Sequence, residues 1–340
     1  MKAIFKIIVI ALIIPSLALA NGKNEKWKHT EKKTYNKEFS VNADATLKIS
    51  NKFGNLDIQS WSQNKVKIDV LIEVGGNNSE KVKEQLNKIS VNFTNTPDLV
   101  EAITKMEKQK WKWKKGNKIS IKINYTVRVP KSNKVNLSND YGSIMLDELD
   151  GKAAINCDYG KIKIGKLNSS ENSINSDYSS GSSIRYIKGG NINADYSGLT
   201  IDKADNISIN ADYTNTTLKS VGTFNYNGDY GNLMVEKGGA INGNGDYTNI
   251  NIEELTKSLN FNSTYGGVKV NKMGTSVSEV NINTTYAGVY LGNSGGHNFT
   301  FDVQTTYADV KLPDNARITT EVKKISKKHY AGYVGSASSG

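Results

Sequence analysis

Apolar and polar positions alternate on both sides of a tyrosine that recurs along the chain. Counted from each tyrosine, the residue four places before it is nearly always apolar, as are the residues three and five places after it. Alternation with period two predicts strands with one buried face. The phase shifts by one residue just after the tyrosine, often at a glycine, which predicts a bend or bulge between two strands. The recurring residues are Tyr141, Tyr159, Tyr178, Tyr196, Tyr213, Tyr230, Tyr247, Tyr265, Tyr286 and Tyr307.

The spacing of these tyrosines predicts a stacked architecture. Intervals run from 17 residues, as between Tyr196 and Tyr213, to 21 residues, as between Tyr265 and Tyr286. A unit this short cannot bury its own apolar face and must stack on its neighbours. We therefore predict an all-β parallel β-helix or β-solenoid whose rungs each contain strand, corner, strand and loop. At Tyr178 a polar run delays the first apolar residue to Ile184, which predicts a local bulge.

An earlier copy of the repeat lies at residues 47–58, with Phe53 in the tyrosine position. Residues 59–133 separate it from the array and predict a small α+β insert: a strand over 66–74, a helix from near Ser79 through Leu86 and Ile89, and strands over 99–106 and 119–129. Such an insert would cover the N-terminal end of the stack, where strand edges are otherwise unpaired. The predicted segments are a signal peptide (1–20), an N-terminal segment with the first solenoid-like unit (21–58), the α+β insert or cap (59–133), the β-solenoid repeats (134–312) and a C-terminal cap or tail (313–340).

The register aligns outward residues into columns. An asparagine column occupies the position three before the tyrosine, where side-chain amides can bond one another up the stack. It consists of Asn156, Asn175, Asn193, Asn210, Asn227, Asn244, Asn262 and Asn283. An aspartate column directly precedes the tyrosines, and we expect each carboxylate to cap the turn by accepting from the N–H two residues on; a row of Ca²⁺ ligands is the alternative. Its members are Asp140, Asp158, Asp177, Asp195, Asp212, Asp229 and Asp246.

The repeat tyrosines allow two interpretations. Their phase with the apolar positions favours packed corners, with each hydroxyl reaching the surface or a loop carbonyl. A platform on which sugar rings stack would need the tyrosines to point outward, and the alternation argues against that orientation.

Charge and the N-terminus bear on location and partners. The net charge is +11 and falls to +9 without Lys2 and Lys6, so anionic partners such as acidic polysaccharide, lipid headgroups or DNA are compatible with the chain, as is a solvated surface. Residues 1–20 combine a basic start, an apolar stretch and Ala18-Leu19-Ala20, which is typical of a cleaved secretory signal. No later segment has the roughly 20 apolar residues of a spanning helix. We expect an exported protein, periplasmic, on the outer surface or secreted.

Catalytic motifs are not evident. The three histidines have no partner at a recognisable motif spacing, and no phosphate loop, His-Glu-x-x-His motif or cysteine cluster occurs. We therefore expect no enzyme, cofactor or metal site, although parallel β-helices do host carbohydrate-cleaving enzymes whose acidic residues come from neighbouring rungs. Cys157 is the single cysteine, so no intramolecular disulfide can form, and its place in the repeat predicts a small buried filler.

A basic and aromatic segment follows Glu107. Its lysines and tryptophans are compatible with contact to a polyanion or a membrane surface. The alternative is a strand with lysines on its wet face, running into a hairpin near Gly116 and Asn117. The candidate contact residues are Lys108, Lys110, Trp111, Lys112, Trp113, Lys114 and Lys115.

Three motifs together resemble a known family: Lys52-Phe53-Gly54-Asn55-Leu56-Asp57-Ile58, Val127-Arg128-Val129-Pro130, and units such as Asn139-Asp140-Tyr141-Gly142. They are similar to exported bacterial β-solenoid proteins called putative adhesins, related to the head domain of putative auto-transporter adhesins, over nearly all of residues 40–312. The resemblance implies a non-enzymatic surface-interaction protein that contacts polysaccharide, matrix or cell-surface polymers. It supplies no catalytic or binding residues. An envelope structural or signalling component without external ligand and a polysaccharide-acting β-helix enzyme stay open as alternatives.

Overall fold

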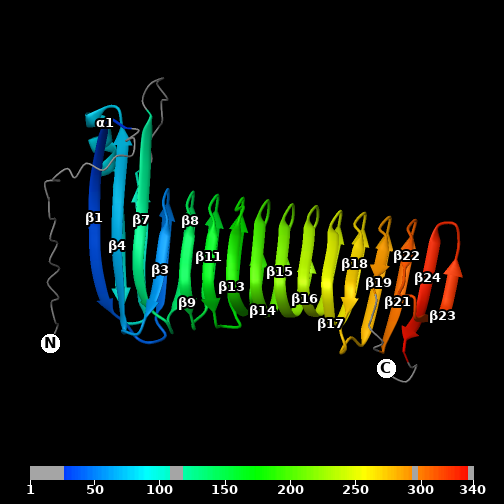
Figure 1. The fold of residues 1–340 in the computed structure, drawn as a ribbon. Helices are drawn as coiled ribbons and strands as arrows, with labels where there is room; N and C mark the ends of the chain where they lie inside the picture. Colours follow the sequence, from blue (N-terminus) through cyan, green and yellow to red (C-terminus); the bar gives the residue numbers. More distant parts are fainter. Residues whose placement is uncertain (1–26, 108–117, 293–297, 336–340) are drawn as a thin grey trace.

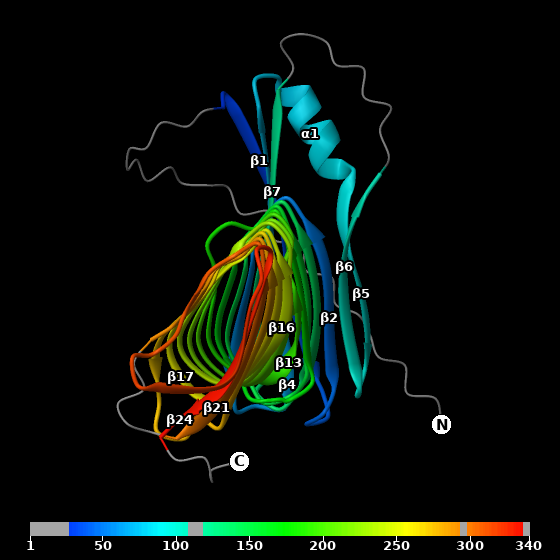
Figure 2. The ribbon, with the colours of Figure 1, turned by 90° about the vertical axis from the view of Figure 1, so that its right-hand side faces the viewer.

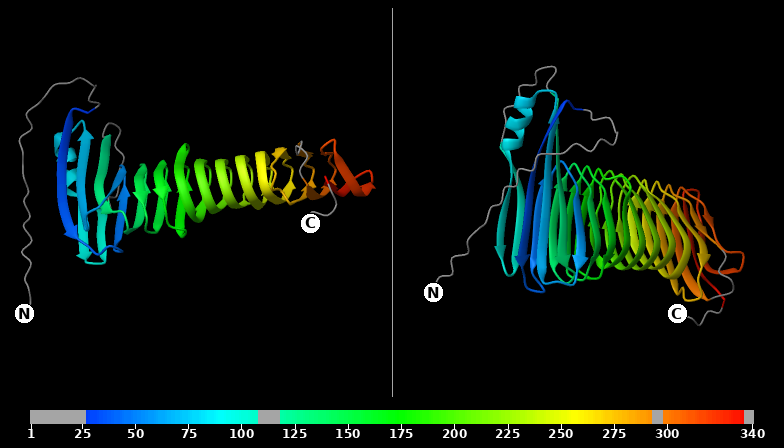
Figure 3. Two further views of the ribbon diagram at one scale, coloured as in Figure 1. Left: turned by 60° about the horizontal axis from the view of Figure 1, so that its bottom comes forward. Right: turned by 60° about the vertical axis from the view of Figure 1, so that its left-hand side comes forward.

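The computed structural model describes residues 27–107, 118–292 and 298–335. Within these ranges the rungs stack in single file into a rod, with a mixed N-terminal element at one end and a hairpin at the other (Figures 1 and 3). Neighbouring rungs pair in parallel, which confirms the predicted β-solenoid. The predicted signal peptide at residues 1–20 lies outside the described residues. No helix of the described residues is long and apolar enough to cross a membrane.

Each rung contributes a strand to each of two walls that meet at the tyrosine corner, as the view along the rod shows (Figure 2). The first wall, before the corner, contains β2 (Thr46–Lys52), β8 (Lys134–Asp140), β10 (Ala153–Asp158), β12 (Asn172–Asp177), β19 (Glu279–Thr285) and β21 (Phe299–Thr306). The second wall contains β3 (Leu56–Trp61), β9 (Ile144–Leu149), β11 (Ile162–Leu167), β18 (Val268–Met273), β20 (Val289–Leu291) and β22 (Val310–Lys311). Long strands in the middle join the second wall of one rung to the first wall of the next: β13 (Ser182–Asn193), β14 (Gly198–Asn210), β15 (Asn215–Asn227), β16 (Asn232–Asp246) and β17 (Asn249–Thr264).

The core is a set of apolar columns between the walls. In the first wall Ile155 is paired with Leu137 on one side and Ile174 on the other, and all three are at most 1% exposed. In the second wall Leu199 lies opposite Thr216, and Ile201 lies opposite Leu218, so the inward positions stay in register. The alternation read from the sequence therefore marks the buried face correctly.

The rung after Tyr178 contains the predicted bulge. Gly181 adopts a φ of +79°, a left-handed conformation that suits glycine. Ser182 then lies opposite Leu199, and Ile184 lies opposite Ile201. The extra residue is thus absorbed before Ser182, and the stack continues in register.

The N-terminal element extends both walls with mixed strands and one helix. β7 (Ile119–Pro130) pairs in parallel with β3, and β4 (Lys65–Gly76) lies antiparallel between β7 and β1 (His29–Ser40). On the first wall, β6 (Leu99–Met106) pairs in parallel with β2, and β5 (Ile89–Thr96) pairs antiparallel with β6. Phe93 of β5 meets Tyr35 and Phe39 of β1, with ring centroids 5.8 and 6.3 Å apart. Aromatic side chains thereby join the two outer strands of this end.

The helix of this element is shorter than predicted. α1 (Ser79–Asn87) begins after Asn78, whose side-chain oxygen accepts from the N–H of Lys81 at 3.0 Å. Its end at Asn87 corrects the expectation that it runs through Ile89, because Ile89 is the first residue of β5 and is fully buried. β1 was not predicted, since its side chains are only half-buried on one face.

Two buried asparagines join the N-terminal element to the rod. The Asn51 amide donates to the carbonyl of Ile123 and to the side-chain oxygen of Asn139, both at 3.0 Å. The Asn139 amide in turn donates to the carbonyl of Gly54 at 2.8 Å. These bonds satisfy polar groups that the junction removes from water.

The C-terminal hairpin changes the direction of pairing. β24 (Lys327–Val334) runs antiparallel to β21, and β23 (Ala316–Lys323) runs antiparallel to β24. The edge of β21 is therefore covered by a strand that does not continue the parallel repeat.

Replacing Asn139 tests the junction. Asn139→Ala should lower the free energy of unfolding by about 1–3 kcal/mol, because it removes the acceptor of one of the two hydrogen bonds of the buried Asn51 amide and the side-chain donor to the Gly54 carbonyl. Ser176→Ala is the matched control: Ser176 occupies the equivalent inward position, and its buried hydroxyl has no hydrogen-bond partner among the described residues. It should change stability by less than about 0.5 kcal/mol. Urea unfolding followed by circular dichroism measures both, and equal losses would contradict this account.

Candidate functional site

The recurring tyrosines form one continuous ladder of stacked rings on the outside of the corner. With Phe53 at its N-terminal end, the ladder has ring centroids 4.8–5.4 Å apart and planes within 11° of parallel. The tyrosine rings are 47–60% exposed. This corrects the expectation of inward-packed tyrosines. We call this row of Phe53 and the ten repeat tyrosines the aromatic ladder.

A left-handed backbone turns these rings outward. Among the described residues, all non-glycine residues with positive φ belong to the aromatic ladder, with φ between +51° and +63°. A residue in this conformation breaks the in-and-out alternation, so that the aspartate and the tyrosine after it both face solvent. The one-residue phase shift thus lies at the tyrosine itself and not at the glycine after it.

The glycine that often follows the tyrosine serves a close approach between rungs. A Cβ atom at Gly142 would lie 1.8 Å from the carbonyl oxygen of Gly54, and one at Gly160 would lie 2.0 Å from that of Gly142. Other rungs place a hydroxyl residue there. Thr214 donates to the carbonyls of Ala194 and Asp212 at 2.7 and 2.9 Å.

The corner keeps its backbone hydrogen bonds despite the turn. The N–H of Tyr141 donates to the carbonyl of Asp158 at 2.9 Å, and the N–H of Tyr213 donates to that of Asp229 at 2.8 Å. A left-handed conformation costs roughly 1–2 kcal/mol per non-glycine residue. Each stacked pair contributes about 0.5–1.5 kcal/mol beyond its buried area, so stacking and backbone pairing together offset the strain.

The asparagine column bonds along the rod, as predicted. The amide of Asn175 donates to the oxygen of Asn156 at 2.7 Å, and Asn193 donates to Asn175 at 2.8 Å. The same contact joins Asn210 to Asn193 at 2.9 Å. Asn175 and Asn193 therefore each donate to the asparagine of one neighbouring rung and accept from that of the other.

The aspartates also bond between rungs, which corrects the expected capping within one turn. The carboxylate of Asp177 accepts from the backbone N–H of Asp195 at 3.3 Å, and that of Asp212 accepts from the N–H of Asp229 at 3.0 Å. At the N-terminal end, Lys52 pairs with Asp140 at 2.8 Å. Partial burial, together with the charges of Asp177 and Asp140, raises the pKa of Asp158. No group of metal-binding side chains occurs among the described residues.

A second amide column flanks the aromatic ladder on the other side, two places after the tyrosines, and sequence reasoning missed it. Asn232 donates to Asn215 at 2.8 Å, and Asn249 donates to Asn232 at 3.4 Å. Three asparagines at equal spacing were the available signal. The outer corner therefore presents phenol, carboxylate and amide groups side by side.

Toward the C-terminal end, the second wall has an outer hollow of about 510 Å³. Its floor includes Gly267 and Gly288, which have no side chain to fill it. Tyr290 lies between Lys269 and Lys311 in the strand register, with ammonium groups 5.8 and 5.5 Å from its ring centroid. This hollow thus places two ammonium groups and the carboxylate of Asp309 around an aromatic ring and an apolar floor.

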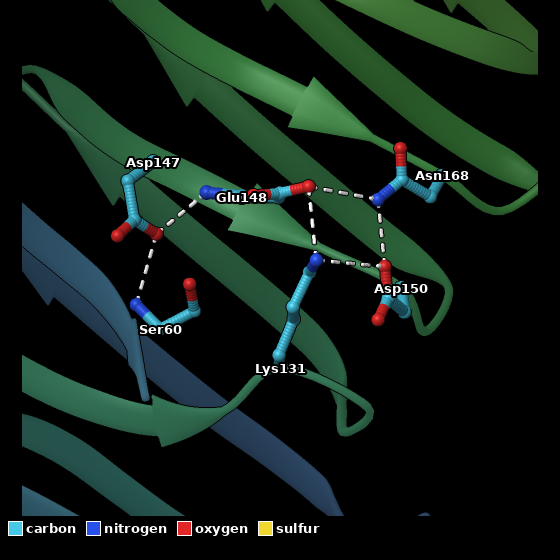
Figure 4. A network of polar contacts seen from close by, with 6 residues as sticks. All are labelled: Ser60, Lys131, Asp147, Glu148, Asp150 and Asn168. Atoms are coloured by element: carbon cyan, nitrogen blue, oxygen red, sulfur yellow. Dashed lines mark hydrogen bonds and ion pairs between the residues drawn. The ribbon is translucent and has the colours of Figure 1, made fainter. Parts of the chain in front are cut away.

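An ion-pair network lies near the N-terminal end of the rod, where the repeats begin (Figure 4). Lys131 pairs with Glu148 at 3.0 Å and with Asp150 at 3.6 Å, and Asn168 donates to both carboxylates. The hydrogen bond from Lys131 lowers the pKa of Glu148. Both carboxylates are thus engaged in ionic and hydrogen-bond contacts with Lys131 and Asn168.

Two further candidates came from the sequence, Cys157 and the basic and aromatic segment. Cys157 is fully buried, in agreement with a filler role, and burial raises the pKa of its thiol to about 11. The basic and aromatic segment Lys108, Lys110, Trp111, Lys112, Trp113, Lys114 and Lys115, with the hairpin expected near Gly116, lies outside the described residues.

Fold and site together define a parallel β-solenoid with a solvent-facing aromatic ladder. No family model matches the sequence, and no curated protein matches it. Solved structures that resemble it include putative adhesins, the kind of protein that the sequence motifs resemble. One, from Parabacteroides distasonis, is 10% identical with a TM-score of 0.37, covering 82% of this chain and 97% of that one. A putative cell adhesion protein from Clostridium sporogenes is 12% identical with a TM-score of 0.20, covering 83% and 97%. At these values the likenesses carry no argument about a ligand.

Substitutions at Tyr213 test the left-handed corner. Tyr213→Ala removes the ring and keeps a Cβ at positive φ, whereas Tyr213→Gly removes the ring and the strain. We expect both variants to be less stable than the parent, with the glycine variant more stable than the alanine variant by about 1 kcal/mol. Urea denaturation measures the order; an alanine variant as stable as the glycine variant would show that the backbone is not strained.

Alkaline pH should weaken the fold. Burial raises the pKa of Cys157 to about 11 and that of Tyr226 to about 12, above the ordinary values of 9.0 and 10.0. The folded state keeps protons that the unfolded chain releases, so unfolding free energy falls as pH rises from 9.0 through about 11.

The matched variant is Cys157→Ala, because alanine occupies the equivalent inward position at Ala194 and Ala211, two places before a repeat tyrosine. Its urea midpoint should fall less steeply across this pH window than that of the parent. Parallel pH profiles would refute the role of the thiol.

Proposed function

We propose that this chain is an exported, non-enzymatic surface-interaction protein of the adhesin type, which binds an extended polysaccharide along its outer corner. The observation that carries the proposal is the unbroken aromatic ladder, with amide and carboxylate columns beside it. A polymer repeats along its length, and so does this surface, at about 4.8 Å per rung.

The chemistry of the corner favours hydrogen bonding to hydroxyl groups. Stacked rings cover one another's faces, so the ladder presents ring edges and phenol hydroxyls to a ligand. Carboxylates accept hydrogen bonds, whereas amides and phenols both donate and accept. This set of groups suits the hydroxyls of a sugar chain and argues against stacking of sugar rings on tyrosine faces.

Binding along such a surface gains from repetition. Each hydrogen bond between neutral groups contributes only about 0.5–1.5 kcal/mol. Hydrogen bonds to successive sugars of one polysaccharide chain add together, because the first contact holds the next sugar at a high effective concentration. The proposal therefore predicts weak binding of short oligosaccharides and much tighter binding of long ones.

A non-enzymatic role is supported by how the carboxylates are used. Asp57, Asp147 and Asp202 line an outer hollow of about 640 Å³. Asp147 accepts from the N–H of Ser60 at 2.9 Å, and Asp202 pairs with Lys219 at 2.7 Å. The carboxylates of Asp147 and Asp202 are thus engaged in a hydrogen bond and an ion pair with neighbouring groups.

The proposal of export rests on the sequence of residues 1–20. The proposal of a second contact surface rests on the basic segment of residues 108–115. We include the lysines of that segment as an electrostatic site for anionic surfaces. Their contribution should be sensitive to salt, because exposed charges are screened within about 10 Å at 0.1 M salt.

Binding of residues 21–340 to a panel of neutral and acidic polysaccharides, matrix proteins and anionic vesicles, at low and high salt, tests the function. We expect selective, salt-resistant binding of a polysaccharide. The triple variant Tyr178→Phe, Tyr196→Phe and Tyr213→Phe keeps the stack, as Phe53 does, but removes three hydroxyls. It should weaken binding at least about tenfold, since three neutral hydrogen bonds are worth about 2 kcal/mol or more.

The matched control replaces Asn191, Ser208 and Asn225 with alanine. These outward residues lie on the first wall, two positions farther from the corner than the asparagine column. Their loss should leave binding unchanged. Binding to every polyanion that disappears with salt, and with Lys112, Lys114 and Lys115 replaced by glutamine, would reduce the activity to a basic surface. Binding of matrix proteins alone would reject the polysaccharide, and no binding at all would favour an envelope structural or signalling role.

A further inference from the structure

We propose that the aromatic ladder is a site of oxidative modification, at which neighbouring tyrosines of one chain couple to form dityrosine. The oxidant would be hydrogen peroxide acting through a haem peroxidase. This inference does not depend on the proposed polysaccharide binding, because it uses only the geometry and exposure of the rings.

The ladder places phenols next to one another at unusually regular spacing. From Tyr141 to Tyr307, successive ring centroids are 4.8–5.1 Å apart. The planes of neighbouring rings lie within 11° of parallel, so adjacent phenols face each other along the whole row. Each phenol therefore has a coupling partner beside it before any oxidation occurs.

The rings are also open to an external oxidant. Exposure of 47–60% leaves one edge of every tyrosine ring in solvent. By contrast, the tyrosines of the interior, Tyr125 and Tyr226, are at most 2% exposed. The ladder is accordingly a concentrated and accessible set of phenols.

The reaction balances with peroxide as the electron acceptor. Two phenols each lose one electron and one proton to give two phenoxyl radicals, whose ortho carbons join by a new C–C bond. Each joined carbon then loses its hydrogen as a proton, and each oxygen regains a proton. In sum, two tyrosines and one hydrogen peroxide give one dityrosine and two waters, and the protein loses the mass of two hydrogen atoms.

Coupling within a chain has an advantage over coupling between chains. A radical on one ring has its neighbour in contact at all times, whereas a second molecule must first be met in solution. Groups held together in this way act at effective concentrations of about millimolar or more. At micromolar protein the products should therefore be monomeric.

Dityrosine would supply a covalent link that this sequence otherwise lacks. The single cysteine, Cys157, is buried and has no second cysteine to pair with. Each coupling would close a loop of one rung, 17 to 21 residues, as given by the tyrosine intervals. Closing such loops restricts the unfolded chain, so oxidised protein should unfold at a higher urea concentration.

Two variants with the same number of remaining ladder tyrosines provide the test. The alternating variant replaces Tyr141, Tyr178, Tyr213, Tyr247 and Tyr286 with phenylalanine, so that no two ladder tyrosines are adjacent. The block variant replaces Tyr141, Tyr159, Tyr178, Tyr196 and Tyr213, so that the remaining five are adjacent. Phenylalanine keeps the stack in both, since Phe53 already stacks on Tyr141 with centroids 5.4 Å apart.

The folded proteins are treated with peroxidase and peroxide, and the monomer fraction is analysed by dityrosine fluorescence and peptide mass spectrometry. We expect cross-links between neighbouring ladder tyrosines in the parent and the block variant, and at least about tenfold fewer in the alternating variant. Parent protein unfolded in urea before oxidation should lose the preference for neighbours. Equal yields in the two variants, cross-links only between chains, or no dityrosine in the block variant would each overturn the proposal.

Discussion

Parallel backbone hydrogen bonding between rungs is the constraint on which the rest of this structure depends. It sets every residue opposite its counterpart one rung away, at the spacing of neighbouring strands, about 4.8 Å. A side chain in such a stack meets its own kind, so each position must tolerate self-contact. Isoleucine and leucine do so in the core. Asparagine does so through amide hydrogen bonds, tyrosine does so by ring stacking, and aspartate does so by accepting from the next backbone N–H.

The aromatic ladder follows from this constraint and from the sharpness of the corner. A chain that turns between two walls within one residue needs a backbone conformation that L-residues rarely adopt. Glycine would adopt it at no steric cost but would add no contact. Tyrosine adopts this conformation at a cost in backbone strain, and its ring stacks on the rings of both neighbouring rungs, with centroids 4.8 Å apart in the middle of the rod. The corner is therefore held by contacts between rungs, and an isolated rung would not keep it.

The sequence predicted the fold and the buried face well, because burial imposes a period that local pattern reveals. The predicted orientation of the tyrosines was wrong, because a non-glycine residue in the left-handed conformation leaves no compositional signal. The turn was assigned to glycines such as Gly142, whereas the positive φ lies at the preceding tyrosine. The bond from the N–H of Asp229 to Asp212 was also missed, since its donor is 17 residues away along the chain. β1 was missed because three of its five half-buried positions, Glu31, Lys33 and Lys37, carry charged residues, so its burial alternation has no matching apolar pattern. The positions of the first asparagine column and of the aspartate column, in contrast, were predicted from spacing alone.

The repeat varies in length, yet the aromatic ladder at the corner is unbroken. The interval between tyrosines changes from 17 to 21 residues, but in the longest rungs the first-wall strands β17, β19 and β21 stay in register up to the residue before the tyrosine. Extra residues collect away from the corner, as between β18 and β19, or at a glycine such as Gly181. Length variation there costs little, because a loop closes with a penalty that grows slowly with its length. A change at the corner would instead break the aromatic ladder, the amide columns and the backbone pairing together. The corner is thus the part of each rung where the fold permits the least variation, and it is also the surface that offers an extended ligand or an oxidant the same chemistry at every step.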